Sequence, residues 1–154
     1  GTRLYGVQMV SAMNALGLDY MTFGNHEFDL TRDWLMKRIA ESEFTWISSN
    51  VNDSVTGQPF ENVAQHKLLD FQGCRVLIIG LTTDDSKGAG DYADIVSEGA
   101  LSDFTKALLR SFRGKYDVLV ALTHLDLNTD VHLAQTVPEI HMIIGGHEHD
   151  GWHL

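Results

Sequence analysis

The spacing of apolar residues along the chain alternates between helical and strand-like. Helical spacing predicts helices over residues 4–16, about 34–41, 101–112 and, for a shorter stretch, 130–136. Short β-rich or continuously apolar runs predict strands over 20–23, 44–48, 63–71, 75–81, 117–122 and 140–144. Polar segments rich in Asn, Asp, Ser and Gly predict an exposed loop over 50–59 and another over 84–90.

Strands that alternate with helices are typical of an α/β fold. The run 76–79 is apolar at every position, as expected for a strand covered on both faces. Gln72-Gly73 is predicted to join 63–71 and 75–81 in a hairpin. We therefore expect a layered α/β domain with a mostly parallel central sheet flanked by helices.

Composition narrows the class of protein. The chain has 154 residues, enough for one globular domain, and is 44% hydrophobic. Its formal net charge of −10 disfavours coating of a nucleic-acid backbone. Cys74 is the only cysteine, which excludes an intrachain disulfide framework and a zinc site built from several thiolates. No apolar run approaches the ~20 residues of a membrane span.

Three of the predicted strands are followed by histidine. Asn25-His26 follows the strand at 20–23, His124 follows 117–122, and a Gly-Gly-His-Glu-His run containing His147 and His149 follows 140–144. The carboxyl ends of parallel strands lie along one edge of a sheet, where ligands generally bind. These side chains are therefore expected to converge.

The converging groups have the chemistry of a metal site. The oxygen and imidazole donors of Asn25, His124, His147 and His149 suit a divalent ion such as Mn, Zn, Fe, Co or Ni. The absence of thiolates argues against a purely structural zinc site. His66, His132, His141 and His153 fit no such cluster, and we expect them at the surface or at strand ends.

The same segments resemble the calcineurin-like metallophosphoesterases, and specifically their 5'-nucleotidase branch. The resemblance extends over nearly the whole chain and is carried most specifically by the hexapeptide Gly-Asn-His-Glu-Phe-Asp at 24–29. The other matching runs are His124 after a strand, Gly-His-Glu-His at 146–149, and the flanking segments 13–20, 46–51 and 80–83.

This resemblance implies a two-metal hydrolase of nucleotides or related phosphomonoesters. Asn25, His124 and His147 would bind one metal and His149 the other, and a metal-bound hydroxide would attack phosphorus. His26 would be the catalytic imidazole. From its spacing, Asp29 is expected to keep His26 charged and oriented. No substrate-binding residue is predicted.

Family motifs that supply further metal ligands are missing. Members begin with a D-x-H and a G-D motif upstream of the helix at 4–16, and neither is upstream here. Asp130-Val131-His132 and Gly90-Asp91 match those strings but lie downstream, and we interpret both as coincidence. We therefore expect residues 1–154 to be a single partial catalytic domain, truncated at both ends, with weak or absent hydrolysis on its own.

Two other functions remain open from the sequence. A 2',3'-cyclic nucleotide phosphodiesterase would share these motifs, and a non-catalytic metal-binding scaffold would keep the fold without turnover. Retention of His26 and Asp29 favours truncation of an enzyme over loss of catalysis. A parallel sheet that lacks strands leaves an unpaired edge, which predicts possible self-association. The sequence predicts neither the identity of the metal nor a compartment.

Overall fold

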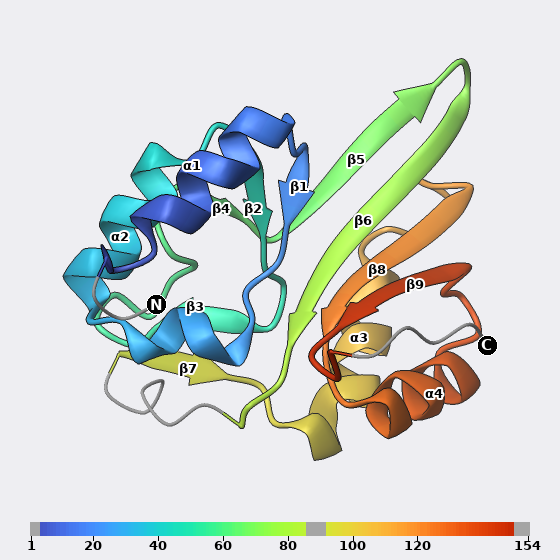
Figure 1. The fold of residues 1–154 in the computed structure, drawn as a ribbon. Coiled ribbons are helices and arrows are strands. Elements are labelled where there is room, and N and C mark those ends of the chain that lie inside the picture. Colours follow the sequence, from blue (N-terminus) through green and yellow to red (C-terminus); the bar gives the residue numbers. More distant parts are fainter. Residues whose placement is uncertain (1–3, 86–91, 150–154) are drawn as a thin grey trace.

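The computed structural model describes residues 4–85 and 92–149, and its elements alternate between helix and strand (Figure 1). The helices are α1 (Val7–Leu16), α2 (Arg32–Glu41), α3 (Leu101–Arg110) and α4 (Leu127–Thr136), with short 3-10 helices at Asn25–Asp29 and Glu98–Ala100. The strands are β1 (Tyr20–Met21), β2 (Thr45–Ile47), β3 (Val51–Asp53), β4 (Val63–Ala64), β5 (His66–Phe71), β6 (Cys74–Thr82), β7 (Ala93–Ile95), β8 (Val118–His124) and β9 (Met142–Gly146).

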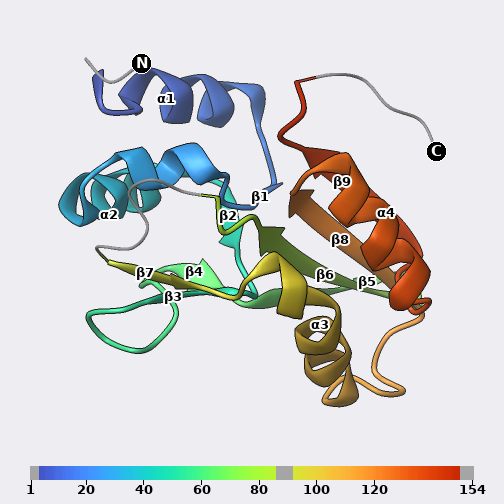
Figure 2. The ribbon, with the colours of Figure 1, turned by 90° about the horizontal axis from the view of Figure 1, so that it is seen from below.

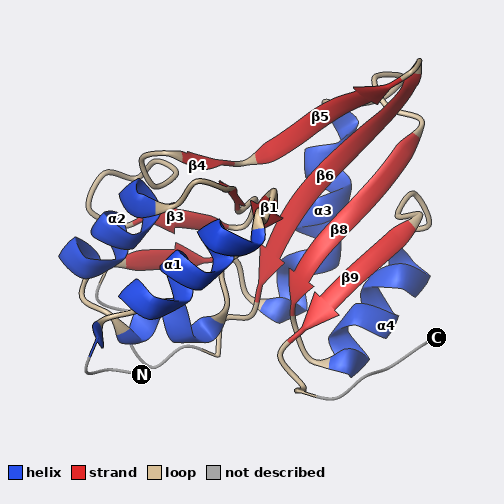
Figure 3. Cartoon of the chain, turned by 45° about the horizontal axis from the view of Figure 1, so that its top comes forward, coloured by secondary structure: helices blue, strands red, loops and turns tan. Residues whose placement is uncertain are grey.

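The strands form two larger sheets and one small antiparallel pair. In the four-stranded sheet β5-β6-β8-β9, the strands β6, β8 and β9 are parallel, and β5 is antiparallel to β6. Helices α3 and α4 lie on one face of this sheet (Figure 3). The second sheet, β1-β2-β4, is wholly parallel, with α1 and α2 beside it (Figure 2). The predicted α/β class, with parallel strands flanked by helices, is confirmed.

The strand register brings the ends of β6, β8 and β9 level with one another. Thr82 lies opposite His124, and His124 lies opposite Gly146. Because the three strands run in the same direction, the segments that follow them leave from the same edge.

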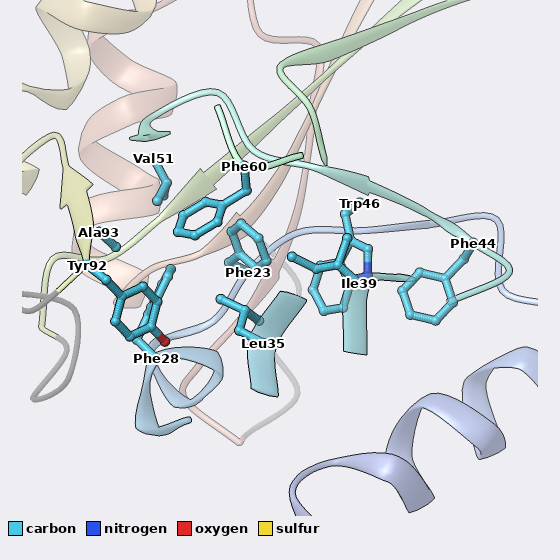
Figure 4. Close-up of a cluster of buried hydrophobic side chains, with 10 residues drawn as sticks. All are labelled: Phe23, Phe28, Leu35, Ile39, Phe44, Trp46, Val51, Phe60, Tyr92 and Ala93. Carbon is cyan, nitrogen blue, oxygen red and sulfur yellow. The ribbon is translucent and has the colours of Figure 1, made fainter. Parts of the chain in front are cut away.

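Two hydrophobic clusters hold the layers together. The first is aromatic and surrounds Phe23, which is completely buried (Figure 4). Its ring lies 5.0 Å from the ring of Trp46, 5.4 Å from Phe28 and 5.9 Å from Phe60. The second cluster joins β6 and β8 to α3 and α4 through residues such as Leu119. Phe23 immediately precedes Gly24, so burial of its large ring fixes the start of the segment that carries Asn25 and His26.

The segment 50–59 is only partly the exposed loop predicted for it: residues 54–58 are exposed, as predicted, whereas its first residues are buried. Asn50 and Asp53 are buried, and β3 within this segment pairs with β7. The Asn50 side chain donates to the Thr82 carbonyl at 2.7 Å and accepts from the Thr82 amide at 3.0 Å. Asp53 forms an ion pair with Arg32 at 2.6 Å. Buried polar groups need such partners, and these partners are distant in sequence.

Several predicted boundaries also change. The strand expected over 63–71 is divided between β4, which pairs with β2, and β5, which pairs with β6. Helix α1 begins at Val7, which is later than predicted. Helix α4 begins at Leu127, which is earlier than predicted. The hairpin between β5 and β6 is confirmed, and its turn residues Gln72 and Gly73 have positive φ. Most of the loop expected over 84–90 lies outside the described residues. In the described ranges, no helix has the length and apolar character needed to cross a bilayer.

Candidate metal and phosphoester site

Three donor atoms from separate parts of the fold converge on one point. The Asn25 Oδ1 atom lies 3.1 Å from His124 Nε2, and His147 Nδ1 lies 3.3 Å from the same nitrogen. Donors bound about 2.1 Å from one metal ion lie about 3.0–3.4 Å apart in octahedral or tetrahedral geometry. Both separations from His124 Nε2 therefore fit a shared metal ion.

The backbone around His124 is built for this convergence. His124 ends β8, and its carbonyl accepts a hydrogen bond from the Thr83 amide at 3.0 Å. Its ring lies so close to Gly24 that a Cβ at that position would be 2.7 Å from His124 Cε1. Only glycine leaves room for this contact, which explains the glycine before Asn25.

His26 and Asp29 form a close pair on the 3-10 helix that follows β1. His26 Nδ1 lies 2.8 Å from Asp29 Oδ2, and both side chains are exposed. Residues three apart lie above one another on a 3-10 helix, so this short helix itself produces the pairing. His26 and His124 line the same cavity of about 640 Å³.

The loop after β9 has strained backbone at both of its predicted ligands. His147 has φ of +103° and His149 has φ of +58°. Such values cost energy for residues other than glycine and persist where the surrounding structure holds them. No hydrogen bond or ion pair joins His149 to another residue of the described ranges. The structure thus brings together Asn25, His124 and His147 and leaves His149 exposed beside them.

The environment of His124 favours the neutral ring. Burial, followed by the nearby rings of His147, His26 and His149, lowers the pKa of His124 to about 4. A neutral imidazole has a free nitrogen lone pair, which is the form that binds metals. Burial also raises the pKa of Glu27, whose carboxylate accepts a hydrogen bond from the Gly24 amide at 2.6 Å.

The remaining described histidines lie where the sequence predicts them, and one residue next to the site was not predicted. Glu27 and Glu148 each accept a backbone hydrogen bond, from Gly24 and Leu127, and these bonds hold their loops in place. The exposed histidines His66, His132 and His141 are at the surface, as predicted, and His153 lies outside the described residues. Asp126, whose Oδ1 lies 3.2 Å from His147 Nε2, was not predicted. Its position two residues after His124 was the available signal.

The downstream string Asp130-Val131-His132, which matches a missing motif, does not join the site. Asp130 accepts a hydrogen bond from the Thr123 hydroxyl at 3.0 Å, and His132 is exposed on α4. Gly90-Asp91 lies outside the described residues. Among residues 4–85 and 92–149, no group of three or more His, Cys, Asp or Glu side chains is arranged to hold a metal ion. The converging set consists of two histidines and one asparagine amide.

The fold and the site place the chain in a known family. The family model of the calcineurin-like phosphoesterases matches residues 6–151, and the chain belongs to that family. These enzymes are phosphoester hydrolases that use divalent metals.

Known relatives support the same class. A 5'-nucleotidase of Vibrio cholerae is 31% identical over 155 residues, covering 90% of this chain and 28% of its own length. The 5'-nucleotidase precursor of Thermus thermophilus superimposes with a TM-score of 0.79 at 28% identity, covering 94% of this chain and 30% of its own. The NAD nucleotidase of Haemophilus influenzae shares the fold, with a TM-score of 0.80 at 22% identity, covering 94% of this chain and 26% of its own. The chain thus spans less than a third of each of these proteins.

Proposed function

We propose that this chain forms part of the active site of a 5'-nucleotidase-type phosphoesterase, which removes phosphate from nucleotides or related phosphomonoesters. The observation that carries the proposal is the convergence of Asn25, His124 and His147 at separations of 3.1 and 3.3 Å. The 5'-nucleotidases among the relatives support a nucleotide as the substrate.

Divalent metal ions are the cofactors in this proposal. Asn25, His124 and His147 would hold one ion, and His149 would contribute to a second. A bound divalent ion supplies a nucleophile at neutral pH by lowering the pKa of its water, and two ions together stabilise the attacking and leaving oxygens. The choice among Mn, Zn, Fe, Co and Ni is left to measurement.

His26 is the proposed catalytic imidazole. Asp29 accepts the hydrogen of Nδ1 at 2.8 Å, which orients the ring and leaves Nε2 for the substrate. A protonated Nε2 can donate to the leaving oxygen or stabilise negative charge as it develops there. Exposure of the ring is consistent with this role, because the proton must reach a substrate that enters from solvent.

The described residues supply fewer donors than a two-metal site needs. Two histidines and an amide are adequate for one weakly held ion, and the exposed His149 beside them is a single donor for a second. We therefore expect weak metal binding and low or no turnover from the 154-residue chain alone.

Metal binding with matched variants tests the roles. Elemental analysis and chelator competition with Mn²⁺ or Zn²⁺ should show about 10-fold or greater loss of affinity in His147→Ala and less than about 2-fold loss in His26→Ala. His132→Ala is the matched control, because His132 is an exposed histidine on α4. Equal losses in His147→Ala and His132→Ala, or in His147→Ala and His26→Ala, would contradict the proposed division of roles.

Substrate choice separates this function from its alternatives. Hydrolysis of 5'-AMP, followed as adenosine and phosphate, should be faster than hydrolysis of 2',3'-cyclic AMP, followed as the ring-opened 3'-AMP or 2'-AMP, in this chain or in a longer protein that contains it, and His26→Ala should abolish it. Preference for the cyclic nucleotide would favour the phosphodiesterase. Metal binding without turnover in the longer protein would favour the scaffold.

A further inference from the structure

Asp126 occupies a helix-capping position but does not cap the helix. It is the residue before α4, in extended conformation, and its side chain makes no capping hydrogen bond. Aspartate at this position normally accepts a hydrogen bond from the first turn of the helix. The carboxylate of Asp126 lies instead beside the His147 ring.

Glu148 takes over part of the capping. Its Oε1 accepts the hydrogen bond of the Leu127 amide, the first of α4, at 3.0 Å. Glu148 comes from the loop after β9, so this contact ties that loop to the start of α4. The tie places His147, the preceding residue, beside Asp126.

Both nitrogens of the His147 ring are engaged. Nε2 lies 3.2 Å from Asp126 Oδ1, and Nδ1 lies 3.3 Å from His124 Nε2. An ionised carboxylate has no hydrogen to donate and its negative charge favours a hydrogen on the nitrogen that faces it, so this ion-pair contact favours the hydrogen on Nε2. The ring then presents the lone pair of Nδ1 to the point where Asn25 Oδ1 and His124 Nε2 converge.

We propose that Asp126 is the positioning residue of this site, which holds His147 with its hydrogen on Nε2 and its Nδ1 lone pair directed at the metal. This inference rests on the proposed function. Histidine ligands in metal sites generally donate their second nitrogen to a carboxylate or carbonyl, and loss of that partner typically lowers metal affinity about 10- to 100-fold. The strained backbone of His147, with φ of +103°, fits a side chain held in place by such contacts.

The first arm of the test needs no metal. Imidazole nitrogen shifts of the ¹⁵N-labelled chain at about pH 8 report which nitrogen carries the hydrogen. The wild type and Asp126→Asn, which keeps a carbonyl acceptor, should show His147 with hydrogen on Nε2. In Asp126→Ala the ¹⁵N shifts of His147 Nδ1 and Nε2 should move toward each other. Unchanged shifts in Asp126→Ala would overturn the proposal.

The second arm measures Zn²⁺ affinity by chelator competition. Zn²⁺ affinity should fall about 10- to 100-fold in Asp126→Ala and less than about 3-fold in Asp126→Asn. Asp103→Asn is the control and should keep the wild-type affinity, because it removes the charge of an exposed carboxylate on α3. If Asp126→Asn binds Zn²⁺ as weakly as Asp126→Ala does, the carboxylate acts as a direct ligand or through its charge. The proposed positioning role is then wrong.

The two arms separate this proposal from the proposed function. A wild-type chain that binds no Zn²⁺ while its His147 shifts still depend on Asp126 would contradict the metal site and keep the positioning role. Zn²⁺ binding that is independent of Asp126, with unchanged shifts, would contradict the positioning role and keep the metal site.

Discussion

Gly24 and His124 are in direct contact, although β1 and β8 belong to different sheets. A Cβ on Gly24 would lie 2.7–2.9 Å from three atoms of the His124 ring. The glycine of the Gly-Asn-His motif thus sets the distance between the segment that carries Asn25 and the strand that ends in His124.

Gly24→Ala is therefore expected to weaken the site. The added methyl group must push the His124 ring away from Asn25, so Zn²⁺ affinity should fall about 10-fold or more, and the free energy of unfolding by about 1–3 kcal/mol. Chelator competition and urea unfolding measure the two effects. Gly99→Ala is the control, because a Cβ at Gly99 would meet nothing within 4 Å. Unchanged affinity in Gly24→Ala would show that the ring is not held as described.

Asn50→Ala should be strongly destabilising. The substitution removes both hydrogen bonds to Thr82 and leaves buried backbone groups without partners, which predicts a loss of about 2–4 kcal/mol in urea unfolding. Asn128→Ala, at an exposed position on α4, should change the free energy of unfolding by less than about 0.5 kcal/mol. Similar losses in the two variants would contradict the bridging role of Asn50.

Asp130 should make stability depend on pH. Burial raises the pKa of Asp130 to about 6, above its ordinary value of 3.8, so the folded chain binds its proton more readily than the unfolded chain. The free energy of unfolding of the wild type, measured relative to Asp130→Asn, should therefore rise as the pH falls from about 7 to about 4. A relative stability that is flat or falls over this interval would disagree with the buried position of the carboxyl group.

The edge of β9 is expected to promote self-association. In the described ranges β9 pairs with β8 alone, and Met142 and Ile144 on it are 55% and 54% exposed. An open, apolar edge strand can pair with a second copy. Light scattering should give a mass above that of the 17.2 kDa monomer, and Ile144→Lys should restore the monomer. A monomeric wild type at about 100 μM would argue against this pairing.

The sequence predicted most of the elements because apolar periodicity records which face each one buries. The exits that carry His124 and His147 followed from the same pattern, since β8 and β9 are parallel neighbours. Asn25 follows β1 of the other sheet and reaches them only because the two sheets pack together, which differs from the single edge predicted. The burial of Asn50 could not be predicted, because its partner Thr82 lies 32 residues away and polar composition alone indicates exposure. Asp126 was missed for a similar reason: it lies between a predicted strand and a helix predicted to begin at residue 130, and only the fold places His147 within its reach.

The contact between Asn25 and His124 joins residues 99 positions apart and two separately paired sheets. Each sheet can form its own hydrogen bonds without the other, whereas the donor set exists only after the two are packed together. Closing a loop of this length costs chain entropy, and the favourable contacts that compensate for this cost form only after the loop is closed. A bound metal ion would therefore report on the docking of the two halves of the molecule, and its release on heating should precede the loss of helix and strand within each half.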